Sequence, residues 1–194
     1  SWGAMLALEY LATRPAGVVS VTLASPVITT ASWMADGKVL VATLPDSTRQ
    51  TIEKHEAAGT TNSPEYQAAS MVFMTKYVFG MEPPFPPEAD SALAGYNPAV
   101  YETMWGPSEF TATGNLRNFD RAALLPELTM PILFTAGRYD EARPETIERF
   151  AQTVPSAEVK IFERSAHMTM LSEREAYVDA VRQFLRKHDA GEAR

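Results

Sequence analysis

The sequence contains no cysteine, which excludes thiol catalysis, disulfide bonds and zinc sites with cysteine ligands. It also lacks a run of roughly 20 apolar residues, the length that a membrane-spanning helix needs. Lys and Arg together number 17 against 24 Asp and Glu, which gives a net charge of −7. Because nucleic acids and anionic lipids attract basic surfaces, we expect neither a nucleic acid nor a membrane as a partner.

The remaining composition is that of an ordinary globular chain, with 194 residues of which 45% are hydrophobic and 21% charged. These values exclude a disordered tail, a collagen-like fibre and a coiled coil. The chain opens with Ser-Trp-Gly-Ala-Met, a stretch typical of the interior of a polypeptide, and the expected location is the cytoplasm.

The first section predicts one helix and one strand. Residues 2–14 are rich in Ala, Leu and Met, which favour a helix, and Pro15 and Gly17 end it. Residues 18–24 form a short apolar run with several β-branched residues, typical of a parallel strand that is buried on both faces.

The middle section contains helices, prolines and aromatic residues but no clear pair of strands. A polar helix is expected over residues 48–58, and a second helix runs from residue 64 to about residue 79, with Ser63 as its cap. The proline-rich run at residues 83–87 excludes a helix and a central strand there.

The last section returns to alternating strands and helices. Residues 131–137 and 157–162 are expected as strands, and residues 144–154 as an amphipathic helix. Residues 172–175, Ser-Glu-Arg-Glu, fit a capping box ahead of a closing helix, and residues 189–194 form a polar tail.

These sections predict an α/β fold with a mainly parallel sheet. Its core covers residues 1–28 and 127–194 and is interrupted by a helical cap over residues 29–126. Three parallel strands leave open edges and too little buried apolar area for a stable sheet that is covered on both faces. We therefore expect further strands, either from sequence missing ahead of Ser1 or from a separate polypeptide.

Three polar residues occur in an order that suggests chemistry. Ser1 stands before a predicted helix, whereas Asp140 and His167 follow predicted strands. Taken singly, such a serine usually has no role, the aspartate often caps a turn and the histidine is often solvated. Together, in the order Ser, Asp, His and at the carboxyl ends of parallel strands, they match a hydrolase triad, in which the histidine takes the serine proton and the aspartate orients it. His55 and His188 are assigned no role.

The sequence resembles the proline iminopeptidase family of α/β-hydrolases, and in pattern the tricorn-interacting aminopeptidases. The resemblance implies the C-terminal part of an α/β-hydrolase fold, in which Ser1 is the serine of the Gly-x-Ser-x-Gly nucleophile motif. Four stretches carry it: Ser-Trp-Gly-Ala-Met at 1–5, Met-Trp-Gly-Pro-Ser-Glu-Phe at 104–110, Gly-Arg-Tyr-Asp-Glu at 137–141 with Pro144, and Ser-Ala-His-Met-Thr-Met at 165–170.

The chain departs from the family pattern at its start. The family carries about a hundred residues ahead of the nucleophile, with the early strands and a His-Gly-Gly-Pro-Gly loop that supplies one donor of the oxyanion hole. The backbone N–H of Trp2 would be the other donor. Missing sequence and a cut before Ser1 are the two explanations that the sequence leaves open.

The resemblance also implies a site for a free amino group. In the family, glutamates from the cap and from the aspartate loop bind the substrate's α-amino group, and Glu109 and Glu141 occupy the matching positions. Two carboxylates would neutralise a buried ammonium group and give it charge-assisted hydrogen bonds. The ordinary alternatives are a turn cap for Glu109 and a solvated side chain for Glu141. Trp105 and Tyr101, close to Glu109 in sequence, would line the side-chain pocket.

The predicted function is a serine aminopeptidase that releases the first residue of short peptides with a free amino terminus, without a metal or other cofactor. An amino-acid amide or ester hydrolase with the same triad is the alternative within enzymes. Two other classes stay open. One is a non-catalytic ligand-binding protein on a hydrolase scaffold, which the complete triad disfavours. The other is an N-terminal-nucleophile hydrolase, whose nucleophile normally precedes a strand rather than a helix.

Overall fold

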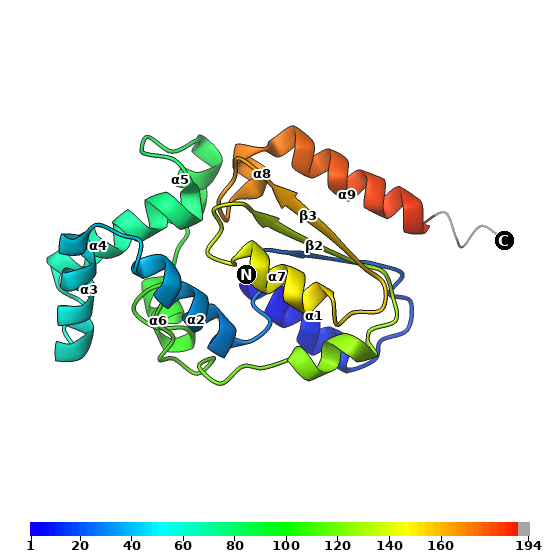
Figure 1. The fold of residues 1–194 in the computed structure, drawn as a ribbon, viewed down its shortest axis with the longest axis horizontal. Helices are drawn as coiled ribbons and strands as arrows, with labels where there is room; N and C mark the ends of the chain where they lie inside the picture. Colours follow the sequence, from blue (N-terminus) through cyan, green and yellow to red (C-terminus); the bar gives the residue numbers. More distant parts are fainter. Residues whose placement is uncertain (190–194) are drawn as a thin grey trace.

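A computed structural model describes residues 1–189, which form a parallel sheet, the helices that cover it and a separate group of helices (Figure 1). Val21 pairs with Ile132, which in turn pairs with Ala157, so the carboxyl ends of the strands meet at one edge of the sheet. In spatial order the strands are β1 (Val21–Ala24), β2 (Ile132–Gly137) and β3 (Ala157–Phe162).

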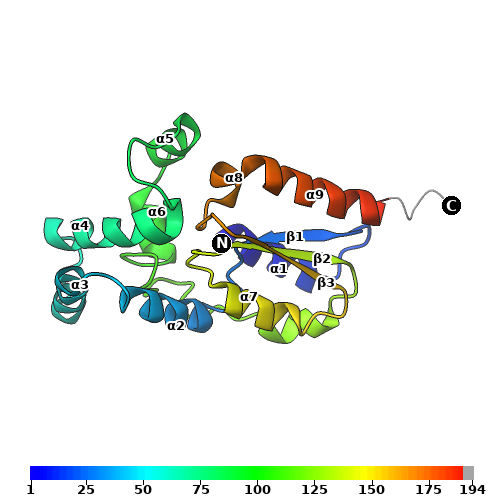
Figure 2. The same ribbon diagram turned by 45° about the horizontal axis from the view of Figure 1, so that its top comes forward.

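Helices cover both faces of this sheet (Figure 2). One face carries α1 (Trp2–Ala12) and α7 (Pro144–Ala151), and the other carries α9 (Arg174–Asp189). Apolar side chains of α1, β2 and α7 meet in one buried cluster, in which Leu8 and Phe134 are completely buried. This is the α/β fold that the sequence predicts.

The cap helices lie beyond the carboxyl ends of the strands (Figures 1 and 2). Their position places them over the edge of the sheet where the predicted triad residues emerge. The predicted domain boundaries at residues 28/29 and 126/127 stay predictions. The cap helices are α2 (Thr30–Val41), α3 (Asp46–Ala58), α4 (Pro64–Phe73), the π-helix η1 (Met74–Phe79), α5 (Pro87–Ala94) and α6 (Pro98–Met104). The 3₁₀ helix η2 (Ala122–Glu127) lies apart from them and packs against the core of the sheet.

β2 and β3 confirm the predicted strands to within one residue, but β1 is shorter than predicted and only half buried. Leu23 is its one fully buried residue. The far edge of β1 pairs with no other strand within residues 1–189, so water reaches positions that a neighbouring strand would cover. The prediction that residues 18–24 are buried on both faces is therefore wrong for this part of the sheet.

The helices differ from their predictions in several places. α2 and α6 were not predicted, α7 ends at Ala151 rather than at residue 154, and the end of the second predicted cap helix is the π-helix η1. α5 begins at Pro87, inside the run predicted to lack helix, because proline is tolerated in a first turn. Ser172 ends the short helix α8 (Thr169–Ser172) and donates to the Ser165 hydroxyl, so the predicted capping box is wrong.

Most of the predicted polar tail, residues 190–194, lies outside the described residues. Among the helices of residues 1–189, none combines the length and the apolar character needed to cross a bilayer.

Candidate active site

Asp140 and His167 lie in the loops that leave the carboxyl ends of β2 and β3. His167 Nδ1 is 2.7 Å from Asp140 Oδ1, and the Asp140 side chain is fully buried. A carboxylate can only accept, so it binds Nδ1–H and leaves Nε2 of the neutral imidazole free to take a proton. The structure thus brings together two of the three residues predicted as a triad.

Three further donors hold the Asp140 carboxylate in place. The backbone N–H groups of Gly137 and Ala142 donate to its two oxygens at 3.1 and 2.8 Å, and Ser25 Oγ donates to Oδ2 at 2.6 Å. Ser25 is buried and directly follows β1, at the same edge of the sheet. The sequence analysis missed Ser25, although its position after a strand is the signal that singled out Asp140 and His167.

We predict that Ser25→Ala lowers the free energy of unfolding by about 1.5–3 kcal/mol, because a buried hydrogen bond to a charged group is lost. Because three other contacts still orient Asp140, kcat should fall less than about tenfold. Urea unfolding and steady-state kinetics measure the two effects, on residues 1–194 joined to a preceding segment that supplies a strand beside β1. Ser91→Ala on the exposed side of α5 is the matched control and should change neither. A Ser25→Ala variant of unchanged stability would contradict this role.

The loop that carries His167 is fixed from three sides. Gly137 in β2 packs so closely against the Ser165 carbonyl oxygen that no side chain would fit between them. On another side, Glu173 accepts a hydrogen bond from the Ser165 hydroxyl at 2.7 Å. From the cap, the carbonyl oxygen of Tyr77 in η1 accepts from the backbone N–H of His167 at 3.2 Å. The sheet and the cap together therefore set the position of the histidine.

Ser1 precedes the first turn of α1 and lies beside the carboxyl end of β1, where its nitrogen donates to the Ala24 carbonyl oxygen at 3.2 Å. It is exposed and borders two cavities. One, of about 430 Å³, is shared with His167, and the other, of about 600 Å³, extends into the cap. Within the described chain no hydrogen bond joins the Ser1 hydroxyl to His167, and such bonds are often long before substrate binds. The Trp2 N–H, at the first helical position, has no acceptor inside the helix.

Glu141 and Glu109 bring two carboxyl groups close to His167. Glu141 Oε1 lies 3.7 Å from His167 Nδ1, and Oε2 has no hydrogen-bond partner among residues 1–189. Burial raises the pKa of Glu141 well above its ordinary value of 4.5, and the nearby Glu109 carboxyl raises it further. Burial also raises the pKa of Glu109, which the nearby Tyr101 hydroxyl and, less strongly, His167 partly offset. In the described part of the chain neither acid has a Lys or Arg partner, so this pair is suited to a cationic ligand.

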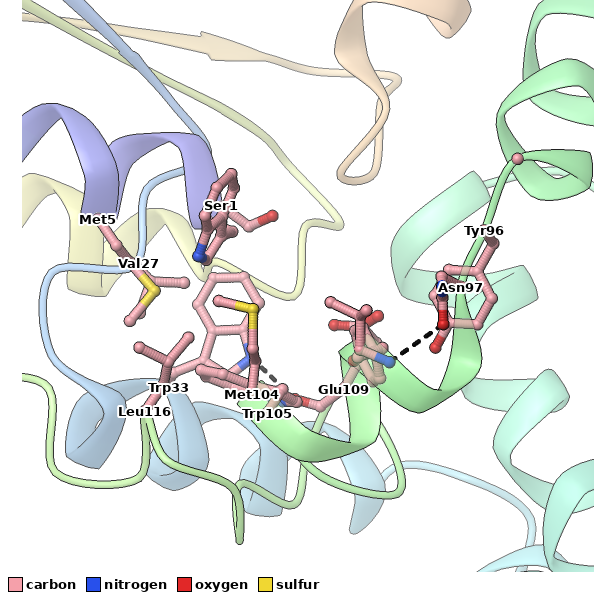
Figure 3. Close-up of a pocket in the computed structure, with 14 residues that line it drawn as sticks. Ser1, Met5, Val27, Trp33, Tyr96, Asn97, Met104, Trp105, Glu109 and Leu116 are labelled. Atoms are coloured by element: carbon pink, nitrogen blue, oxygen red, sulfur yellow. Dashed lines mark hydrogen bonds between the residues drawn. The ribbon is translucent and has the colours of Figure 1, made fainter.

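The larger cavity lies between the start of α1, α2 and α6, and its walls are mainly apolar (Figure 3). Trp105 and Tyr101, predicted as pocket residues from their closeness in sequence to Glu109, both line it. The Trp105 indole N–H donates to the Glu109 carbonyl oxygen at 3.2 Å, so it also fixes the backbone of the acid. The Tyr101 hydroxyl is buried without a partner among the described residues, and this burial raises the pKa of Tyr101.

A parallel sheet with Asp140 and His167 at its carboxyl edge and a helical cap above it defines the class of the protein. The model of the α/β-hydrolase fold family matches residues 1–173, and the chain belongs to that family.

Within this family the chain is similar to proline iminopeptidases, which confirms the resemblance. It is 42% identical over 95% of its length to the proline iminopeptidase of Heyndrickxia coagulans, and 33% identical over 97% to that of Clostridium botulinum. It spans 64% and 65% of the length of these two relatives.

Two solved structures have the same fold over 97% of this chain. The crystal structure of VinJ has a TM-score of 0.90 at 33% identity, and the proline iminopeptidase of Mycobacterium smegmatis has a TM-score of 0.86 at 34% identity. In both cases this chain covers 64% of the other.

Proposed function

We propose that this chain carries the nucleophile, the base and the amino-group site of a serine aminopeptidase acting on short peptides. The observation that carries the proposal is the pair of acids formed by the buried Glu141 and the half-buried Glu109, which lie beside His167 and near the cavity that Ser1 also borders. A protonated α-amino group would neutralise these acids. That amino group is one carbon atom away from the first carbonyl of a peptide, so only the first residue would be presented to Ser1.

In the proposed reaction, Ser1 Oγ attacks the carbonyl carbon of the first residue while His167 Nε2 takes the hydroxyl proton. The tetrahedral intermediate collapses, the C–N bond breaks and His167 returns the proton to the leaving amine. Water then attacks the acyl-serine ester with His167 again as base, which releases the amino acid and restores Ser1. Asp140 stabilises the imidazolium in both halves, and the Trp2 N–H would donate to the oxyanion.

We also propose that a preceding segment completes the fold. The far edge of β1 is unpaired within residues 1–189, and Trp2, Leu6 and Tyr10 on α1 are 51%, 56% and 57% exposed. Such a segment would supply the strand beside β1, a cover for α1 and the second oxyanion donor. We call residues 1–194 together with this segment, either native or taken from the Heyndrickxia coagulans relative, the assembled enzyme.

Residues 1–194 expressed alone are expected to unfold in urea without a single cooperative transition, because an open strand edge and an exposed apolar helix face weaken the core. The assembled enzyme should unfold cooperatively, with the m-value normal for its size. Circular dichroism along a urea titration makes the comparison. A cooperative transition together with hydrolase activity for residues 1–194 alone would show that the segment is unnecessary.

Chromogenic anilides test the proposed function on the assembled enzyme. Prolyl or alanyl p-nitroanilide should be cleaved at least about 100-fold more efficiently, by kcat/KM, than its N-acetylated form, which cannot form the ion pair. Equal efficiencies would refute the amino-group site.

Comparing an amino-acid amide with matched di- and tripeptides separates the aminopeptidase from the amide hydrolase. A cytoplasmic location is part of the same proposal, and fractionation of the source cells tests it.

A further inference from the structure

Trp33, on the cap helix α2, contacts both halves of the proposed site. Its indole N–H donates to the Glu109 carbonyl oxygen at 2.9 Å. Its ring stands nearly perpendicular, at 88°, to the His167 imidazole, with the ring centroids 5.8 Å apart. The residue is only 5% exposed, and Figure 3 shows it beside Trp105 with the two indole groups turned toward Glu109. One side chain therefore joins the candidate amine-binding acid to the candidate base.

The helix that carries Trp33 is held firmly on the same face. Asp36, three residues further along α2, is buried and accepts from Thr146 Oγ1 at 3.0 Å, which ties α2 to the start of α7. Phe110, the residue after Glu109, packs directly on α2 at Gly37. A Cβ at position 37 would lie only 2.8 Å from Phe110 Cβ, so glycine allows this close approach. Positions three and four apart share a helix face, so these contacts set the distance of Trp33 from the catalytic loops.

The loop around Glu109 is also fixed from the other side, within the cap. Tyr66, which is completely buried, donates to Glu56 Oε1 at 3.1 Å and shares a hydrogen bond of 3.0 Å with the Ser108 hydroxyl. Thr111 donates to the same Glu56 oxygen. The residues on both sides of Glu109 are thus anchored in the cap, and Trp33 supplies a contact from this loop toward His167.

We propose that Trp33 is a positioning residue, which sets the separation between the acid that binds the substrate's amino group and the base that activates the nucleophile. The inference rests on the proposed function. Because the amino group and the reacting carbonyl are one carbon apart, a small displacement of Glu109 relative to His167 moves the carbonyl out of reach of Ser1. Trp105 donates to the same carbonyl oxygen, but its ring is not in contact with His167 among the described aromatic pairs.

The test measures how strongly the assembled enzyme prefers prolyl p-nitroanilide to the matched anilide in which carbon replaces the amine nitrogen. Trp33→Phe keeps an aromatic ring and removes the indole N–H, and it should lower this ratio of kcat/KM roughly three- to tenfold, mainly through kcat on the free-amine substrate. Trp33→Leu also removes the ring beside His167 and should lower kcat on both anilides. Phe184→Leu, at a buried position of α9, is the control for stability loss alone and should leave the ratio unchanged.

A double-mutant cycle distinguishes positioning through Glu109 from a general effect on packing. In a Glu109→Gln background, Trp33→Phe should cause no further fall in the ratio. If Glu109→Gln lowers the ratio but Trp33→Phe leaves it unchanged, or if the two effects multiply, the role of Trp33 is refuted while the proposed function stands. If Glu109→Gln itself leaves the ratio unchanged, the proposed function fails, and this inference fails with it.

Discussion

His167→Ala is expected to lower kcat of the assembled enzyme by about 10⁴–10⁶-fold, the range for loss of the base in a serine triad. The variant keeps Ser1 and both acids but has no group that takes the hydroxyl proton. KM for prolyl p-nitroanilide should change little, because the amino-group site is intact. Steady-state kinetics with a sensitive fluorogenic substrate measures the residual rate.

The chain offers a matched control for this variant. His188 lies on α9, where its Nε2 is 3.0 Å from Glu158 Oε1, away from the loops of the site. His188→Ala should therefore keep kcat within about twofold, since surface substitutions seldom have large effects. The triad acts as a unit, so Asp140→Asn should cost about 10⁴-fold alone and far less when His167 is already absent. Activity near the parent level in His167→Ala would exclude the triad.

Glu109→Gln and Glu141→Gln should each lower kcat/KM for free-amine substrates by about 10²–10³-fold. Each substitution removes one carboxylate of the pair that would otherwise hold an ammonium group, and truncating one partner of a desolvated charge pair costs about 2–5 kcal/mol. Activity on the amine-free anilide should change little. Glu102→Gln, an exposed position on α6, is the control and should leave both activities unchanged. A free-amine substrate that is still preferred after both substitutions would place the amino-group site elsewhere.

The two acids also predict opposite effects of pH on stability and on activity. Burial raises the pKa of Glu141 above 4.5 in the folded protein, so the folded form binds more protons and its stability falls as pH rises from 4.5 through the raised pKa. Glu141→Gln removes this cost, and a gain of about 1 kcal/mol would raise Tm by about 2–4 °C at pH 7. Hydrolysis of free-amine substrates needs the ionised acids, so kcat/KM should fall on the acid side at a pH above that of an ordinary carboxylate. A lower Tm for Glu141→Gln at pH 7 would contradict this account.

Local sequence patterns predict the limits of β2 and β3 to within one residue. β2 is an apolar run and β3 alternates apolar with charged residues, and both patterns are visible in the sequence itself. β1 also has an apolar run, but only Leu23 is fully buried, and one edge of the strand pairs with no other strand within residues 1–189. α2 was missed because its sequence, with Thr, Ser and an internal Gly37, has weak helix propensity. Contacts of Trp33 and Asp36 with distant segments supply what the local sequence lacks.

The candidate site likewise contains some residues that the local sequence predicts and others that it does not. Asp140 and His167 were predictable because both follow strands, and the position of a strand end needs only local information. Ser25 and Trp33 act on partners that are 115 and 76 residues away in the chain. Nothing in the neighbourhood of either residue indicates which partner it will contact. Only the packing of the cap on the sheet brings Trp33 to Glu109 and His167, and no periodicity in the sequence encodes that contact.

The central claim is that Ser1 is a nucleophile activated by His167, and a fluorophosphonate probe tests it most directly. The assembled enzyme should be labelled once, and mass spectrometry of the labelled peptide should place the phosphonate on Ser1. Labelling should be lost in His167→Ala and kept in Glu109→Gln, because only the first variant lacks the base. A folded enzyme that stays unlabelled, as expected of a non-catalytic ligand-binding protein, or a phosphonate found on another residue, would contradict the account.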